Sequence, residues 1–389
     1  MRSRLLARGR ALTGCAVAAL TVGVAGCATT TTTPSVTGGT LRIYVSVPPG
    51  AGTQAAEDVL LAERLAFQQS STKVGPFTVK LVPYQGRELS DNARQAVGDS
   101  SAIAYLGELA PGASADSIGI TNGEDVLQVS PTDTAVELTQ PTPAVANSPT
   151  RYYESLSTYG RTFAREVPTD ALEAKALISE MQAQGRSKLY VASDGSPYAK
   201  ALALAVTSNA APAISVVTTQ ASADAVLYAG SSAAGAASIF NQAAAGTPGV
   251  KLFASSALAR DAFAASLSPA AQRDLYVSSP GFTSGDLTAQ GKAFVAAFRA
   301  ANGHAPATEA IFGYEAMAAV MAVLHEAGAS AGNRSTVVHD FFAIRNRSSA
   351  LGTYSINQNG DTSIAPFVFS RVKASKLVPY KAVQEQGAG

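Results

Sequence analysis

The stretch that decides the fold is Leu41-Arg42-Ile43-Tyr44-Val45-Ser46-Val47, in which Leu, Ile and Val alternate with Arg, Tyr and Ser. Alternation at a period of two is typical of a strand. Residues 48–52 read Pro-Pro-Gly-Ala-Gly and end this strand, and residues 53–69 carry apolar side chains at helical spacing. Further strands are expected at 77–82, 102–105 and 126–129, with a short helix at 91–97. This order predicts a parallel α/β sheet with right-handed crossovers.

A second alternating unit begins after residue 168. Its first helix is expected at 171–184, with Thr169 or Asp170 as the N-cap. Strands are expected at 189–192, 213–217, 225–228, 250–253 and 275–277, and helices at 198–208, 233–245, 287–301, 309–327 and 334–344. The tail differs, because strands at 352–357, 367–372 and 378–380 are separated by turns such as Asn359-Gly360. These tail strands predict antiparallel additions to a sheet.

The first 26 residues have the three parts of a secretory signal peptide. Residues 1–10 carry four arginines and no acid, residues 11–26 are uncharged and apolar, and small residues precede Cys27. This ending resembles a bacterial lipobox, in which Cys27 would be lipidated, for example with palmitate, and would anchor the protein to the membrane. The alternative is an ordinary secretory signal in which Cys27 has no role. Residues 27–40 are rich in Thr and Gly and are expected to form a flexible tether.

Charge and cysteine content exclude several classes of function. The signal takes its four arginines with it, so 25 of the 29 basic residues would remain against 28 acidic ones, a net charge of −3. Without a basic cluster the chain offers no footprint for nucleic acid. Cys15 and Cys27 both belong to the signal region, and the three histidines are isolated from one another. Neither a metal nor another cofactor is therefore expected.

Several segments, in chain order, resemble the type I periplasmic binding proteins, whose best-known branch binds leucine, isoleucine and valine for ABC importers. They are the opening strand with its Pro-Gly loop, Leu106-Gly107-Glu108-Leu109, residues 130–139, residues 194–200, Gly313-Tyr314-Glu315-Ala316 and residues 357–361. The resemblance covers nearly all of residues 41–380. It implies an α/β chain with two doubly wound lobes and three interlobe crossings near residues 168, 280 and 350. Lobe 1 would contain residues 41–168 with 281–349, and lobe 2 would contain 169–280 with 350–384. The ligand would lie between the lobes, beyond the carboxyl ends of the strands, where hinge closure would bury it.

The same resemblance assigns candidate ligand-binding residues. In the amino-acid-binding branch, serine, threonine and backbone N–H groups at helix starts hold the ligand carboxylate. The corresponding positions in this chain are Pro111 and Gly112 with Ser114 close by, Thr132, Thr134, Tyr198, Ser231 or Ser232, and Ser256. The family's acid for the ligand ammonium group falls near Ser256, where this chain has no carboxylate. That departure matters because a buried ammonium group without a counter-charge costs several kcal/mol.

Structural roles compete with ligand contact at several of these positions. Thr132 and Thr134 follow a proline and could serve only turn formation or helix capping, and Tyr198 could serve only helix packing. Asp133 is expected on a solvated rim, and Tyr314 in the core.

Taken together, these features predict a lipid-anchored protein on the extracytoplasmic face of the cell membrane. It would capture a small polar ligand, amino-acid-like by resemblance, and deliver it unaltered to the permease of an ABC importer. A monomer without enzymatic activity is expected. Three alternatives stay open: a sensory receptor of the same fold, a scaffolding protein that has lost its ligand, and a secreted hydrolase, although the sequence has no Gly-x-Ser-x-Gly motif.

Overall fold

The computed structural model describes residues 35–50 and 52–384, so the predicted signal, Cys27 and residues 28–34 of the predicted tether lie outside the described part. Residues 35–40 do not form a free tether. Ser35 forms an isolated β-bridge with Asn333, and the Val36 N–H donates to the Gly332 carbonyl at 2.7 Å. The Val36 side chain is buried in the largest core. The packed chain therefore begins before the predicted start at Leu41.

A six-stranded sheet forms around the strand predicted at residues 41–47. In spatial order its strands are β2 (Lys73–Val74), β3 (Phe77–Tyr84), β1 (Thr40–Ser46), β4 (Ala102–Leu106), β5 (Leu127–Ser130) and β6 (Phe163–Arg165). All neighbours run parallel except β2 and β3. Leu41, Ile43 and Val45 enter the core on one face of the sheet, and Tyr44 enters the core on the other.

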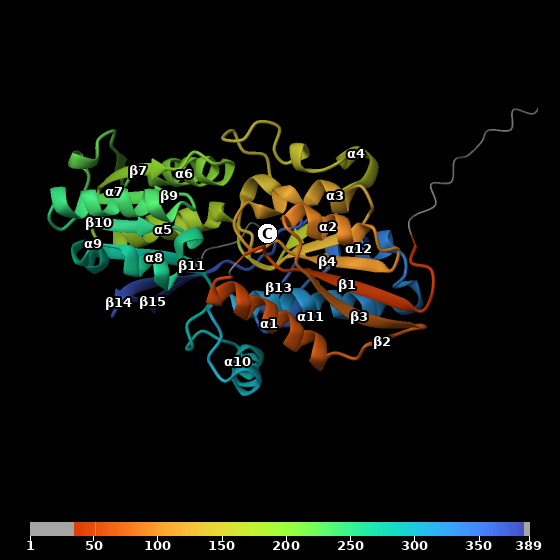
Figure 1. The fold of residues 1–389 in the computed structure, drawn as a ribbon. Helices are drawn as coiled ribbons and strands as arrows, with labels where there is room; N and C mark the ends of the chain where they lie inside the picture. Colours follow the sequence, from red (N-terminus) through yellow and green to blue (C-terminus); the bar gives the residue numbers. More distant parts are fainter. Residues whose placement is uncertain (1–34, 51, 385–389) are drawn as a thin grey trace, which may run out of the picture. The chain divides into compact units, whose positions relative to one another are not determined.

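Helices cover both faces of this sheet, and we call the sheet with these helices the first lobe (Figure 1). One core is built with α1 (Gln54–Gln69), α10 (Ala289–Asn302), α11 (Ala310–Ala327) and α12 (Arg334–Phe342), and the other with α2 (Leu89–Val97) and α3 (Ile118–Asn122). The length and composition of α11 would suit a membrane span, but 67% of that segment is buried in the protein. It corresponds to the helix that the sequence predicts at residues 309–327. Gly313 allows α1 to pack closely on it, because a Cβ there would lie 2.6 Å from the Val59 carbonyl oxygen.

A seven-stranded sheet forms the second lobe. In spatial order its strands are β15 (Lys376–Gln384), β14 (Pro366–Lys373), β11 (Leu275–Pro280), β10 (Lys251–Ala254), β9 (Ala225–Ala229), β7 (Lys188–Ser193) and β8 (Ser215–Val216). The five strands from β11 to β8 are parallel, whereas β14 and β15 add an antiparallel edge, as the turn residues of the tail predict. One face carries α5 (Asp170–Ala183) and α6 (Pro197–Ala210), and the other carries α7 (Ala233–Gly246), α8 (Asp261–Ser266) and α9 (Pro269–Asp274). The short helices α8 and α9 were not predicted.

The two doubly wound α/β sheets confirm the predicted fold class, but the last boundary lies later than residue 350. The strands β12 (Arg347–Ser349) and β13 (Gly352–Tyr354) form a separate small sheet, and Tyr354, Ile356 and Ile364 are buried in the core of the first lobe. The chain joins the second sheet only at Pro366. A sequence pattern of short strands cannot say which of two cores their apolar side chains fill.

Candidate ligand-binding cleft

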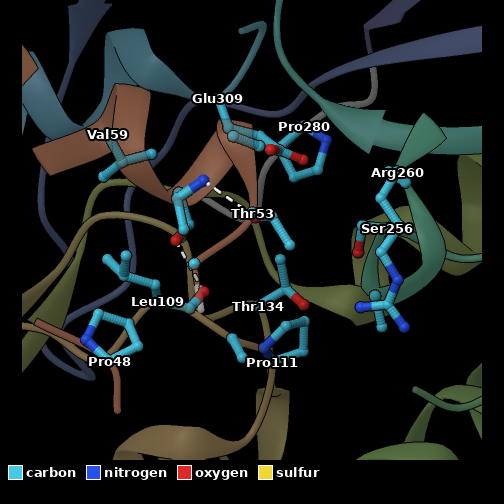
Figure 2. Close-up of a pocket in the computed structure, with 17 residues that line it drawn as sticks. Pro48, Thr53, Val59, Leu109, Pro111, Thr134, Ser256, Arg260, Pro280 and Glu309 are labelled. Atoms are coloured by element: carbon cyan, nitrogen blue, oxygen red, sulfur yellow. Dashed lines mark hydrogen bonds between the residues drawn. The ribbon is translucent and has the colours of Figure 1, made fainter. Parts of the chain in front are cut away.

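A pocket of about 260 Å³ lies among loops of both lobes (Figure 2). Pro48 follows β1, Pro111 follows β4, Thr134 follows β5, and Ser256 follows β10. The first turn of α1 and the residue before α11 complete the wall. The loops therefore come from the carboxyl ends of parallel strands, where open α/β sheets bind their ligands.

The two threonines of the first lobe differ in what their hydroxyl groups do. The Thr132 hydroxyl donates to the Leu109 carbonyl at 2.7 Å and so ties two loops together. Thr134 is 1% exposed, yet its hydroxyl has no partner among the described residues. A buried hydroxyl without a hydrogen bond is unfavourable. Thr134 lines the pocket, so a bound ligand could supply the missing partner.

Asp133, between these threonines, is a structural residue, so its placement on a solvated rim was wrong. The side chain is completely buried and accepts hydrogen bonds from the N–H groups of Gly112 at 2.6 Å and Ser114 at 2.8 Å. Its own N–H donates to the Ser130 hydroxyl. Asp133 therefore fixes the loop after β4 against the loop after β5, which places Pro111 beside Thr134.

Ser256 is a polar residue that the second lobe contributes to the pocket, and it is hydrogen-bonded to a buried carboxylate. Its N–H and its hydroxyl donate to the two oxygens of Glu173 at 2.6 and 2.9 Å. Glu173 lies near the start of α5, and the Ser278 hydroxyl also donates to it. Burial raises the pKa of this carboxyl group. Glu173 does not line the pocket, so it orients Ser256 and leaves the Ser256 lone pairs able to accept from a ligand.

Two charged residues, Glu309 and Arg260, also line the pocket. The sequence did not identify either of them as a site residue. Glu309 is the N-cap residue of α11, but its side chain makes no capping bond, and no ion pair to it occurs within the described residues. Its side chain is partly buried, and this burial, and then the charge of Glu173, raise its pKa to about 7. Arg260 makes one weak contact, from Nη2 to the Ser231 carbonyl at 3.4 Å. The pocket thus offers one acid and one base whose charges are not neutralised by each other or by a close neighbour.

Five candidate residues from the sequence do not line the pocket. The Ser114 hydroxyl is buried and accepts from the Glu108 N–H at 3.1 Å, and Gly112 adopts a left-handed turn with φ of 81°. Tyr198 is 3% exposed and packs in the core of the second lobe. The N–H groups of Ser231 and Ser232 bind Asp194, 2.8 and 3.2 Å from Oδ2. The pocket brings together the other four, Pro111, Thr132, Thr134 and Ser256.

Two doubly wound sheets with a pocket among their strand ends define the type I periplasmic-binding fold, and solved structures agree. The leucine-binding protein LivK of Thermotoga maritima is 19% identical, with 88% of this chain and 98% of that chain covered at a TM-score of 0.72. The branched-chain amino acid binding protein LivJ of Streptococcus pneumoniae, in complex with isoleucine, is 17% identical, with 89% and 100% covered at 0.69. A solute-binding protein of R. palustris in complex with benzoate is 18% identical, with 90% and 99% covered at 0.65.

No protein-family model matches the chain, and no curated protein matches it by sequence. At under 25% identity these structures establish the fold. Within residues 35–50 and 52–384, no histidine hydrogen-bonds a serine hydroxyl, so the hydrolase alternative gains no catalytic cluster there. The same residues contain no group of three His, Cys, Asp or Glu side chains that could hold a metal ion.

Proposed function

We propose that this chain is an extracytoplasmic solute-binding protein that captures a small zwitterion with an apolar part, such as an apolar amino acid, for an ABC importer. The observation that carries the proposal is a pocket with a free hydroxyl, a free carboxyl group and a free guanidinium at the strand ends of both sheets. Proteins of the same fold in complex with leucine and isoleucine support the ligand class. The proposed role is binding and delivery, without chemical change of the ligand.

The pocket can accommodate each part of such a ligand. Thr53, Ala55 and Ala56 place the first turn of α1 on its wall. The Thr53 hydroxyl caps the Ala56 N–H, but the helix dipole still favours an anion there, and Arg260 adds a full positive charge. Glu309 supplies the carboxylate that the sequence lacks at Ser256, since an arriving ammonium group favours its ionised form. Pro48, Val59 and Leu109 provide apolar surface. The Thr134 hydroxyl can donate to, or accept from, either polar end.

A thermal-shift screen of amino acids, nucleosides and sugars tests this proposal. Leucine is expected to raise the melting temperature, whereas 4-methylpentanoate, which lacks the amine, and 3-methylbutylamine, which lacks the carboxylate, should bind more weakly. Thr134→Ala should weaken leucine binding about tenfold and Glu309→Gln about 10- to 100-fold, because hydrogen bonds to charged groups are the stronger ones. Ser231→Ala, outside the pocket, is the matched control and should leave the shift unchanged.

The outcomes of the screen separate three readings of the site. If Thr134→Ala and Glu309→Gln both keep the wild-type shift, the ligand does not occupy this pocket. If 4-methylpentanoate binds as well as leucine and Glu309→Gln has no effect, the ligand is a simple acid. If no compound of the three classes stabilises the protein, capture of a small polar solute is contradicted.

We further propose that lipidation of Cys27 anchors the chain to the extracytoplasmic face of the membrane, where it meets the importer's permease as a monomer. The small residues before Cys27 support this anchor. In the source bacterium, Cys27→Ser is expected to shift the protein from the membrane fraction into the soluble fraction. Cys15→Ser, earlier in the same apolar segment, is the matched control and should stay membrane-bound. A Cys27→Ser protein that still sediments with membranes would show that lipid is not the anchor.

A further inference from the structure

A second pocket lies on the other side of α1 and shares no lining residue with the cleft. It encloses about 330 Å³ between α1 and the ends of β1 and β3. Its wall is mainly apolar and is formed by Val45, Val47, Leu60, Leu61, Leu81 and Pro83. Five of these six side chains are not fully buried, so the pocket is open to solvent. Nothing in the proposed delivery of a solute requires it.

Glu63, a residue of α1, is a buried acid among the residues that line this pocket. Its side chain is 1% exposed, and neither carboxyl oxygen has a hydrogen-bond partner within residues 35–50 and 52–384. Buried polar groups nearly always have partners, so an acid with none at a pocket wall points to a missing one. Burial, and then the charge of Glu108, raise the pKa of Glu63 well above its usual range. Glu63 therefore keeps its proton to a higher pH than a solvated glutamate does.

We propose that this pocket binds a small primary amine with an apolar body, with the ammonium group on Glu63 and the body against the leucines. An ammonium group has three donors and can satisfy both carboxyl oxygens, which an apolar guest cannot. The charged lining does not oppose a cation, because Glu57 and Arg64 balance each other's charge and Glu63 becomes a carboxylate on binding. Glu57 and Arg64 are exposed at the rim, and Glu108 is the remaining charged group near Glu63.

Binding has a proton balance that can be measured. The amine arrives as an ammonium ion, Glu63 gives its proton to water, and the product is a neutral pair of carboxylate and ammonium. One proton is thus released for each amine bound, and affinity should rise with pH until Glu63 ionises in the empty pocket. An apolar alcohol of the same length releases none.

Hexylamine is a suitable probe, with hexan-1-ol as the uncharged control, and both are titrated into the purified protein by calorimetry. In buffers of different ionisation enthalpy, hexylamine should bind with release of about one proton, because linkage ties the proton count to the two protonation states. Glu63→Gln should weaken hexylamine about 10- to 100-fold while hexan-1-ol still binds. Leu60→Trp, which fills the pocket, should abolish binding of both probes. Glu309→Gln, in the cleft, should leave the binding of both hexylamine and hexan-1-ol unchanged, which separates this site from the proposed solute site.

Three results would overturn the proposal. One is the absence of saturable hexylamine binding to the wild-type protein. Another is hexylamine binding without proton release. The third is equal affinity in Glu63→Gln, since hexan-1-ol binding to that variant shows whether the pocket is intact.

Discussion

Replacement of Arg165 by methionine is expected to lower the free energy of unfolding by about 3–5 kcal/mol, the usual cost of removing one partner of a buried ion pair. Arg165 ends β6 and is completely buried. Its Nε lies 3.0 Å from Oδ1 of Asp361, and its two terminal nitrogens donate to the Asp133 carbonyl and the Thr139 hydroxyl at 2.7 and 2.8 Å. Methionine keeps most of the volume but removes the counter-charge of Asp361 and the donor to the Asp133 carbonyl.

The effect should reach the cleft as well as the overall stability. Arg165 holds Asp133, which fixes the loops that carry Pro111 and Thr134. It also holds Asp361 in the turn after β13, where Gly360 packs against the backbone of β6. Arg165→Met should therefore weaken ligand binding along with stability.

Denaturant titration checks the prediction. The control is Arg161→Met, which loses one bond to the Thr139 carbonyl and should cost about 0.5–1.5 kcal/mol. In the double variant Arg165→Met with Asp361→Asn, the loss in free energy of unfolding should be well below the sum of the two single losses. Both substitutions remove the same ion pair. A cost below about 1 kcal/mol for Arg165→Met would mean that the buried network does not hold the loops.

A rise in pH from 5.5 to 8.5 is expected to destabilise the protein by about 3 kcal/mol or more, since one unit of pKa difference is worth about 1.4 kcal/mol. Burial raises the pKa of Glu108, Glu137 and Glu309 to about 7. Burial and the neighbouring Glu315 raise that of Glu166 to about 8. The unfolded chain ionises these acids near pH 4.5, whereas the folded protein keeps their protons. Their stabilising contribution is complete below that pH and is lost as the pH rises through 7 to 8.

Glu166 is the best single group on which to test this dependence. The Tyr354 hydroxyl lies 2.9 Å from Glu166 and 3.1 Å from Glu315, and its one hydrogen cannot serve both carboxylates. A proton on Glu166 resolves the conflict. Glu166→Gln keeps an acceptor for Tyr354 and cannot ionise, so it should flatten the fall in melting temperature between pH 5.5 and 8.5. Glu154→Gln, at an exposed acid, should follow the wild type, and an unchanged slope in Glu166→Gln would contradict the assignment.

Local patterns predicted the fold well because each strand and helix has a period that a single stretch of sequence displays. The alternation in β1 and the apolar run in α11 both marked elements that are buried in the structure. The end of the tether could not be predicted, because Val36 is one valine among small polar residues and its burial depends on Gly332, far along the chain. The last lobe boundary failed for a similar reason, since Ile356 and Ile364 could fill either core.

The site was predictable only where the family resemblance could be carried onto loops after the strands. It pointed to Pro111, Thr132, Thr134 and Ser256, which do line the pocket. Glu309 gave no such signal, because an acid just before a helix usually serves as a cap, and only the tertiary structure shows that it makes no capping bond. Arg260 lies six residues beyond the end of β10. At that distance the position in the sequence no longer predicts which way the side chain points. Asp133 misled because a carboxylate in a polar turn is normally solvated, whereas here backbone N–H groups replace the water.

Reversible capture of one unaltered molecule per chain is the property on which the proposed function rests, and native mass spectrometry of the purified protein with leucine measures it. We expect a saturable complex of one leucine per chain, weakened by Glu309→Gln and unaffected by Ser231→Ala, from which leucine is released with its original mass after prolonged incubation. Absence of a complex with leucine or with any stabilising compound of the screen, or release of a compound of changed mass, would contradict a solute-binding role.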